Sequence, residues 1–253
     1  MFAQRAGCVA SCDQAHETMN PYIHLFGPAH LGMLAAVPVV GGLLAYAHRN
    51  FPARSRAIRL GLGVVLLANM VIFYRWSHPL SFPGDMPLEL CDFSLFLAIL
   101  SLFTLKPDFF DLAYFWALAG ASMALLTPNL NEPFPSFGTV EFFVTHGLTV
   151  AAVLYLVWSH QARPRTWSVL RAMIGINIVA LIDGPFDYFF GTDYFFLRAK
   201  PANPSLLDYL GPWPLYILTT EGVALILFLL LYLPVRRRGV AMPAEAGQLT
   251  AQK

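Results

Sequence analysis

The sequence contains the stretch Met86-Pro-Leu-Glu-Leu-Cys-Asp-Phe-Ser-Leu-Phe-Leu-Ala-Ile-Leu-Ser-Leu-Phe-Thr-Leu105, in which three reactive side chains directly precede a hydrophobic run. Carboxylates at the mouth of a membrane segment are expensive to place, so Glu89 and Asp92 mark a functional position. Pro87 fits the first turn of a helix, where its missing N–H is not needed. Cys91 would then lie in the opening turns, where the helix dipole favours a thiolate. We therefore predict a reactive site at the start of a membrane-spanning helix.

The composition is that of a membrane protein. Of the 253 residues, 57% are hydrophobic and 12% are charged, against roughly 25% charged residues in soluble domains. The formal net charge of +1 gives no basic surface for nucleic acid, so we expect no nucleic-acid partner. Three cysteines are too few for a disulfide scaffold. Cys8 and Cys12 could pair in the N-terminal tail, which leaves Cys91 as a free thiol.

Seven apolar stretches follow a polar N-terminal tail, each near the ~20 residues that a spanning helix needs. They lie at 28–48, 58–76, 87–105, 110–127, 139–159, 167–187 and 213–233. The pattern predicts an all-α polytopic membrane protein, a bundle of seven transmembrane helices. Residues 1–26 lack the apolar region of a signal peptide and form an extracytoplasmic tail. Residues 27–234 form the transmembrane domain, and residues 235–253 a disordered cytoplasmic tail.

The basic residues predict the orientation of the bundle. Twelve of the 16 Lys and Arg residues lie on the side of the first, third and fifth loops and of the C-terminus. The other four are Arg5, Arg75, Arg198 and Lys200. We therefore expect the N-terminus outside and the C-terminus in the cytoplasm, in a multi-pass protein of the plasma (inner) membrane.

This orientation sorts the ionisable residues by depth. The outer half of the predicted bundle contains Glu89, Asp92, Glu141, His146, Asp183, Asp187 and Glu221. We expect the cytoplasmic half to contain only apolar side chains, with Lys and Arg at its edge, so that it is plain hydrocarbon with a basic rim. Because polar groups inside a membrane line sites or pathways, the asymmetry predicts a polar cavity open to the outer leaflet or the space beyond it.

A thiol and an imidazole at similar predicted depth make a candidate nucleophile and base. Cys91 would attack an ester carbonyl, and His146 would take and return the proton. Backbone N–H groups near Pro87 would bind the oxyanion. The carboxylates that could orient the imidazole are those of Glu89, Asp92 and Glu141. This arrangement predicts a cysteine-dependent acyltransferase or lipid hydrolase, whose partners are membrane lipids with phospholipid acyl chains as substrate.

Other interpretations of these residues stay open. Packing alone would explain Cys91, since close helix contacts use small-residue stripes such as Cys91, Ser94, Ala98 and Ser101. His146 would then only hydrogen-bond to a neighbouring helix. A protein that binds or transports a small solute or cation would use Asp183, Asp187 and Glu221, and a non-catalytic scaffold would use the polar residues only to connect helices. No closely spaced ligand motif supports a metal site built from His30, His146, Asp183 and Glu221, so we expect no metal and no cofactor. 

Two outer loops, 127–137 and 201–214, are stiffened by proline and rich in aromatic residues. They are suited to cover the cavity as a lid, and anchoring at the membrane interface would explain them equally well. The candidate substrate-binding residues are then Asp92, Glu141, Asp183, Asp187, Glu221, Asn129 and Trp213.

Five motifs stand in order along the chain: Met86-Pro-Leu-Glu-Leu-Cys91, Leu126-Thr-Pro-Asn-Leu130, Phe142-Phe-Val-Thr-His-Gly147, Gly191-Thr-Asp-Tyr-Phe-Phe-Leu197 and Ser205-Leu-Leu-Asp-Tyr-Leu-Gly-Pro-Trp-Pro-Leu-Tyr-Ile-Leu218. Over roughly residues 22–234 the chain resembles the YwaF-like integral membrane proteins, relatives of transmembrane protein 164. The resemblance implies seven helices. For the eukaryotic branch it also implies acyl transfer between membrane lipids through a cysteine and a paired histidine, here Cys91 and His146. This chain has Glu89 where the family commonly has histidine, and Asp193 where it commonly has asparagine.

Overall fold

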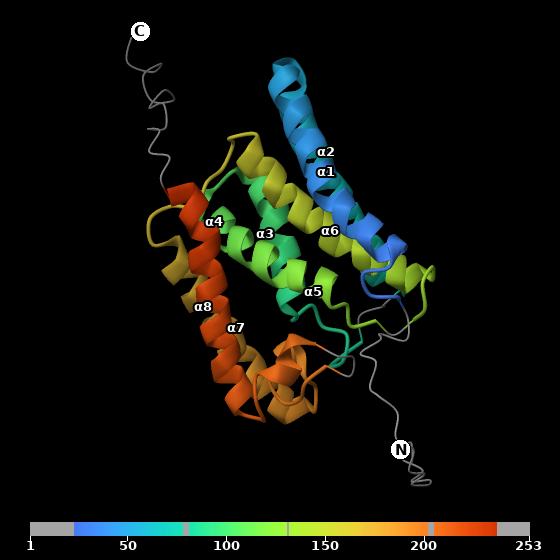
Figure 1. Cartoon of the computed structure of the whole chain (residues 1–253), viewed down its shortest axis with the longest axis vertical. Helices are drawn as coiled ribbons and strands as arrows, with labels where there is room; N and C mark the ends of the chain where they lie inside the picture. The colour runs from blue at the N-terminus through green and yellow to red at the C-terminus, as the bar shows by residue number, and fades with distance from the viewer. Residues whose placement is uncertain (1–22, 78–80, 131, 202–204, 237–253) are drawn as a thin grey trace.

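The computed structural model describes residues 23–77, 81–130, 132–201 and 205–236, and all regular structure in them is helical (Figure 1). The predictions for the tails at 1–22 and 237–253, with Cys8 and Cys12, lie outside the described residues. The α-helices are α1 Pro28–Asn50, α2 Ser55–Ile72, α3 Leu90–Thr104, α4 Pro107–Phe115, α5 Ser122–Leu126, α6 Phe137–Trp158, α7 Ser168–Phe190 and α8 Leu215–Arg236. Short π or 3-10 turns are η1 Pro52–Arg54, η2 Phe73–Ser77, η3 Trp116–Ala121, η4 Tyr194–Phe196 and η5 Leu206–Tyr209.

The described helices match the seven predicted spans. Six helical segments are long and apolar enough to cross a membrane, and α4, η3 and α5 together form one of them. The predicted third span contains α3, a shorter apolar helix of 15 residues. The prediction of an all-α polytopic membrane bundle is confirmed.

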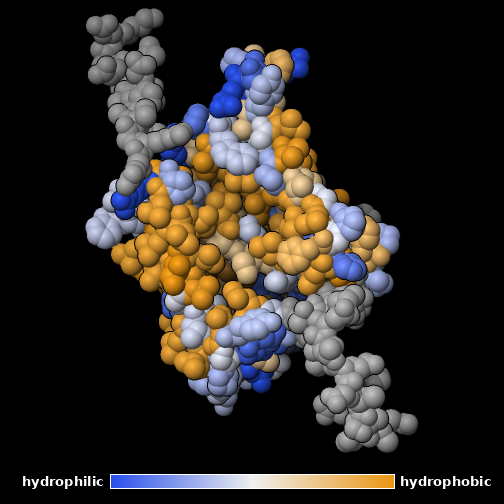
Figure 2. Space-filling model, viewed as in Figure 1, coloured by the Kyte–Doolittle hydropathy of each residue, from blue (hydrophilic) through white to orange (hydrophobic). Residues whose placement is uncertain are grey.

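The centre of the bundle consists of α3, the α4–η3 segment and α6. Their fully buried side chains include Leu102, Phe115 and Tyr155. Gly41 allows α1 to approach α6 closely, since a Cβ there would lie 3.1 Å from the carbonyl oxygen of Ala151. By contrast, only 11% of the residues in the apolar stretch of α8 are buried, against 56% in that of α6. The exposed apolar side chains of the outer helices cover much of the face in Figure 2, as expected for surfaces that contact lipid.

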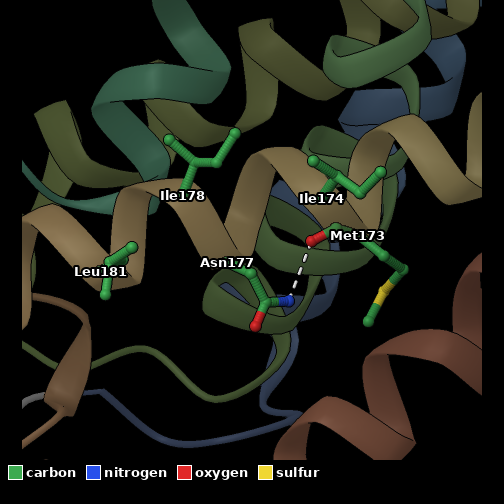
Figure 3. A pocket seen from close by; sticks show the side chains of 5 residues that line it. All are labelled: Met173, Ile174, Asn177, Ile178 and Leu181. Carbon is green, nitrogen blue, oxygen red and sulfur yellow. Dashed lines mark hydrogen bonds between the residues drawn. The ribbon is translucent and has the colours of Figure 1, made fainter.

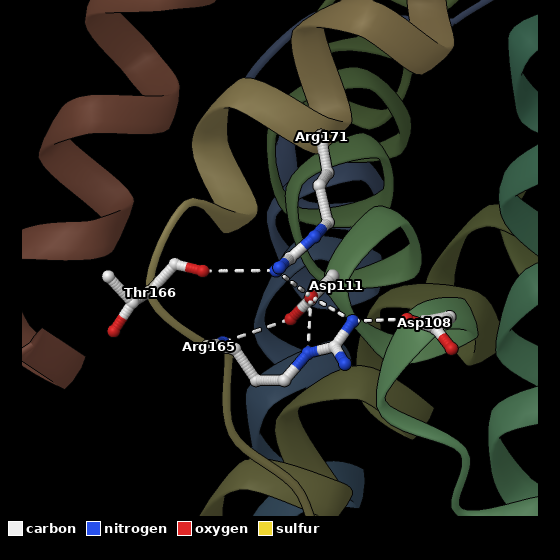
Figure 4. A network of polar contacts seen from close by, with 5 residues as sticks. All are labelled: Asp108, Asp111, Arg165, Thr166 and Arg171. Atoms are coloured by element: carbon white, nitrogen blue, oxygen red, sulfur yellow. Dashed lines mark hydrogen bonds and ion pairs between the residues drawn. The ribbon is translucent and has the colours of Figure 1, made fainter.

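A buried carboxylate corrects one prediction about the end of the bundle expected to be cytoplasmic. Asp111 in α4 is fully buried and accepts hydrogen bonds from Nε of Arg165 at 2.9 Å and from Nη1 of Arg171 at 3.0 Å (Figure 4). The half predicted to be plain hydrocarbon therefore contains a buried charge. Two arginines near the start of α7 neutralise it, because a buried carboxylate needs charged or hydrogen-bonding partners.

The third helix begins later than predicted. Glu89 has an extended backbone, with φ −71° and ψ 151°, and its N–H donates to Oδ2 of Asp92 at 3.1 Å. This contact caps the helix and fixes its start at Leu90. Pro87 therefore lies before the helix, and the prediction that it occupies the first turn is wrong. Cys91 nevertheless lies in the first turn of α3.

Candidate functional site

The start of α3 contacts the loop that follows α7. The hydroxyl of Tyr194 donates to the carbonyl oxygen of Pro83 at 2.8 Å and accepts from the N–H of Met86 at 2.9 Å. The N–H of Phe195 donates to Oε2 of Glu89 at 3.2 Å. These contacts fix the Glu89 carboxyl between α3 and the loop after α7.

Glu89 lies in the connecting segment before α3, outside the membrane-spanning helices. Burial raises the pKa of its carboxyl to about 7, and the carboxylates of Asp92, Asp183 and Asp187 act in the same direction, against the hydrogen bond from Phe195. The same interactions show that two acidic residues of α7 lie near the start of α3. A carboxyl group with this pKa can both accept and release a proton near neutral pH.

The two acidic residues of α7, Asp183 and Asp187, are fully buried and lie one helical turn apart. Oδ1 of Asp187 accepts from the hydroxyl of Thr192 at 2.7 Å and from the N–H of Tyr194 at 3.0 Å. Both carboxyl oxygens of Asp183 and Oδ2 of Asp187 have no hydrogen-bond partner among the described residues. Buried oxygens of this kind are rare, which makes Asp183 and Asp187 candidates for binding a proton or a cation.

A second group of polar side chains connects η2 to α3 and α2 to α6. The hydroxyl of Tyr74 donates to Oδ1 of Asp92 at 2.6 Å and lies within electrostatic range of Cys91 and Glu141. Nδ2 of Asn69 donates to Oε1 of Glu141 at 3.4 Å. We call these five residues the outer polar cluster. Sequence reasoning missed Tyr74, because a tyrosine at the end of an apolar stretch also fits a simple interface anchor.

Cys91 differs from the rest of its small-residue stripe. Ser94, Ala98 and Ser101 are fully buried, and each serine hydroxyl donates to the carbonyl oxygen one turn earlier. Cys91, at the end of the stripe, is a free cysteine whose residue is half-buried. No hydrogen bond joins it to His146 within the described part of the chain. Packing thus accounts for the fully buried members of the stripe, and Cys91 is the least buried of the four residues.

The two buried histidines use their ring nitrogens differently. Nδ1 of His30 accepts from the N–H of Phe26 at 2.9 Å, so its Nε2 carries a proton and donates to the carbonyl oxygen of Leu125 at 2.8 Å. Nδ1 of His146 lies 2.8 Å from the carbonyl oxygen of Phe142. Because a carbonyl only accepts, this nitrogen carries the proton, and Nε2 is the basic nitrogen. Both nitrogens of His30 are hydrogen-bonded to the backbone, whereas only Nδ1 of His146 is.

The remaining predicted residues do not join the outer polar cluster. Glu221 accepts from Nδ2 of Asn177 at 3.1 Å, and Asn129 is exposed after α5. The exposed Trp213 donates to the carbonyl oxygen of Leu197 at 3.0 Å. The described residues contain no group of three His, Cys, Asp or Glu side chains placed to bind a metal ion. A groove of about 320 Å³ on α7 (Figure 3) is lined by Met173, Ile174, Asn177, Ile178 and Leu181.

Comparisons with known proteins cover most of the chain. The model of the TMEM164 family matches residues 25–232. An uncharacterized protein of Treponema pallidum (strain Nichols) is 26% identical over 221 residues, which span 83% of this chain and 89% of the relative. No solved structure matches. The family match includes the start of α3, the outer polar cluster, His146 and the acidic residues of α7. The chain is thus a multi-pass membrane protein that belongs to the TMEM164 family.

Proposed function

We propose that this protein is a membrane enzyme that transfers acyl chains between lipids, with Cys91 as nucleophile and His146 as base. The observation that carries the proposal is the position of Cys91 in the first turn of α3, where it is the least buried member of its stripe and lies next to Asp92 and near Tyr74. The free basic nitrogen of His146 supports the second role.

The proposed reaction has two balanced steps. As the sulfur of Cys91 attacks the ester carbonyl of a phospholipid, its proton passes to Nε2 of His146. The tetrahedral intermediate collapses to a thioester on Cys91, and the lysophospholipid oxygen leaves with the proton from His146. The hydroxyl of a second lipid then attacks the thioester and returns a proton to the sulfur through His146. Water in place of the second lipid gives hydrolysis. In this proposal the ester of the bound phospholipid lies between Cys91 and His146, since no hydrogen bond joins these two side chains among the described residues.

Glu89 stands where the related sequences commonly have histidine, and we assign it a second proton-carrying role. Its pKa of about 7 lies close to the ordinary histidine value of ~6.5. The variant Glu89→His should therefore keep acyl transfer, whereas Glu89→Gln, which cannot exchange a proton, should slow it. Equal rates in the two variants would remove Glu89 from the mechanism.

Acyl exchange in reconstituted vesicles tests the proposal. The vesicles contain a phospholipid with a labelled acyl chain and an unlabelled lysophospholipid acceptor. Cys91→Ser should abolish transfer, and His146→Ala should lower it by roughly 100-fold or more, the range for loss of a general base. The matched controls are Ser101→Ala in the same stripe and His24→Ala on an exposed loop. Wild-type rates in both test variants would refute the proposed function.

The unpartnered oxygens of Asp183 and Asp187 favour a second candidate, binding or transport of a proton, cation or small solute. It predicts that Na⁺ raises the thermal unfolding midpoint or that the protein supports uptake. Either effect should disappear in Asp183→Asn and persist in Cys91→Ser. Glu221 lies apart from this pair, since its partner Asn177 is six residues before Asp183, or about 9 Å along α7. A scaffold without chemistry would show neither acyl exchange nor ion-dependent stabilisation.

A further inference from the structure

A second cavity, of about 560 Å³, lies near the C-terminal ends of α1, α6 and α8, the end of the bundle predicted to be cytoplasmic. Figure 2 shows a hollow in the apolar face between α8 and α6. Its volume lies within the ~300–1,000 Å³ of sites that bind small ligands. The cavity is lined by Gly42, Ala45, Arg49, Tyr114, Leu118, Leu154, Val157, Trp158, His160, Arg163, Pro234 and Val235.

The charges of this lining have one sign. Arg49 lies in the last turn of α1 and Arg163 in the loop after α6, where its Nη2 is 3.1 Å from Nδ1 of His160. No Asp or Glu belongs to the described residues that line the cavity. Asp111 neutralises two nearby arginines, but Arg49 has no ion pair with any described residue. The cavity therefore combines apolar sides with a cationic end, which matches an amphiphile with an anionic head.

We propose that this cavity binds an anionic phospholipid, with its phosphate at Arg49 and Arg163 and the upper part of an acyl chain along Leu118, Leu154 and Val157. Guanidinium groups suit phosphate because their paired N–H donors match its oxygens. Basic pockets between helices on the cytoplasmic side of a membrane bind anionic head groups for this reason. A free phosphate would leave the apolar lining unused. The site is separate from Cys91 and does not depend on the proposed acyl transfer.

The test titrates the purified full chain in mild detergent with phosphatidylglycerol, with phosphatidylcholine of the same chains, and with inorganic phosphate. Binding is followed by native mass spectrometry and by the thermal unfolding midpoint. Phosphatidylglycerol should bind and stabilise the protein more than either other probe. Arg49→Ala and Arg163→Ala should each weaken its binding roughly tenfold, the effect of one lost charge-assisted contact.

Two further variants separate the cavity from general surface charge. Arg54→Ala removes an exposed arginine at the same end that does not line the cavity, so phosphatidylglycerol binding should stay near the wild-type level. Gly42→Leu leaves every charge in place. A Cβ on Gly42 would meet Trp158 at an ordinary 3.8 Å, so the side chain can enter the cavity while the helix keeps its stability. This variant should lose phosphatidylglycerol binding and still unfold at the wild-type temperature.

Three results would overturn the proposal. The first is equal binding of phosphatidylglycerol and phosphatidylcholine. The second is equal stabilisation by inorganic phosphate, which would indicate a free-anion site. The third is an Arg54→Ala effect as large as that of Arg49→Ala, which would indicate attraction to the surface as a whole.

Discussion

Replacing Asp111 by asparagine removes a buried charge that two arginines share. The carboxylate accepts from the N–H of Arg165 at 3.0 Å, from its Nε at 2.9 Å and from Nη1 of Arg171 at 3.0 Å (Figure 4). Asparagine has a similar shape but offers one acceptor oxygen in place of two and carries no charge. At least one N–H therefore loses its acceptor, and both guanidinium groups lose their counter-charge.

The magnitude follows from the burial of the three groups. Breaking a fully buried ion pair destabilises a protein by about 3–5 kcal/mol. The side chains of Arg165 and Arg171 are 38% and 43% exposed, so water replaces part of what is lost. We expect about 2–3 kcal/mol for Asp111→Asn. For a chain of this size, that lowers the unfolding midpoint by about 4–12 °C.

Asp108 supplies the matched control, because it pairs with the same Arg165 while its side chain is 76% exposed. Water screens a pair this exposed, so Asp108→Asn should shift the midpoint much less than Asp111→Asn does. The assay is thermal unfolding of the detergent-solubilised protein, followed by tryptophan fluorescence and circular dichroism. Equal shifts in the two variants, or an Asp111→Asn midpoint within 1 °C of wild type, would refute the role of burial in this network.

Two further predictions concern the connecting segment and the packing of α7. The pKa of Glu89 rises from its ordinary 4.5 to about 7 on folding, so the stability that its protonated form contributes is present below about pH 4.5 and lost as the pH rises through 7. Unfolding midpoints measured from pH 4 to 8 should show this loss in the wild type and not in Glu89→Gln; parallel curves would count against it. A Cβ on Gly175 would lie 2.9 Å from Cζ2 of Trp116, so Gly175→Ala should destabilise the protein by about 1–3 kcal/mol. Gly61 has nothing within 4 Å, and Gly61→Ala should be neutral or stabilising by up to about 1 kcal/mol; the reverse order of midpoints would contradict the packing of α7.

The helices could be predicted because a membrane constrains both the length and the composition of a spanning segment. The start of α3 could not, since it depends on a contact between the Asp92 carboxylate and the N–H of Glu89, which hydropathy does not register. The network of Asp111 was also hidden. Its partners Arg165 and Arg171 lie 54 and 60 positions further along the chain, one in a predicted loop and one just inside the sixth predicted span, and nothing in the sequence pairs them with Asp111.

The sequence predicts roughly where the candidate site residues lie along the membrane normal, but it does not predict which of them are in contact. Counting basic residues orders side chains along the membrane normal and groups Cys91, Asp92 and Glu141. In the structure the hydroxyl of Tyr74 donates to Asp92 and lies within electrostatic range of the other two. Counting basic residues places a side chain only to within a turn or two of helix. Glu221 was therefore grouped with the α7 carboxylates, although it accepts from Asn177, six residues or about 9 Å before Asp183 along α7.

A trapped acyl group on Cys91 would show the covalent intermediate of the proposed transfer. The purified protein is incubated with a phospholipid and no acceptor, and its intact mass and its peptides are then measured by mass spectrometry. We expect one added acyl group on the peptide that contains Cys91, removable by neutral hydroxylamine and absent in Cys91→Ser. Acyl transfer that proceeds at the wild-type rate in Cys91→Ala, with no acyl group on Cys91 in the wild type, would contradict the proposed role of Cys91.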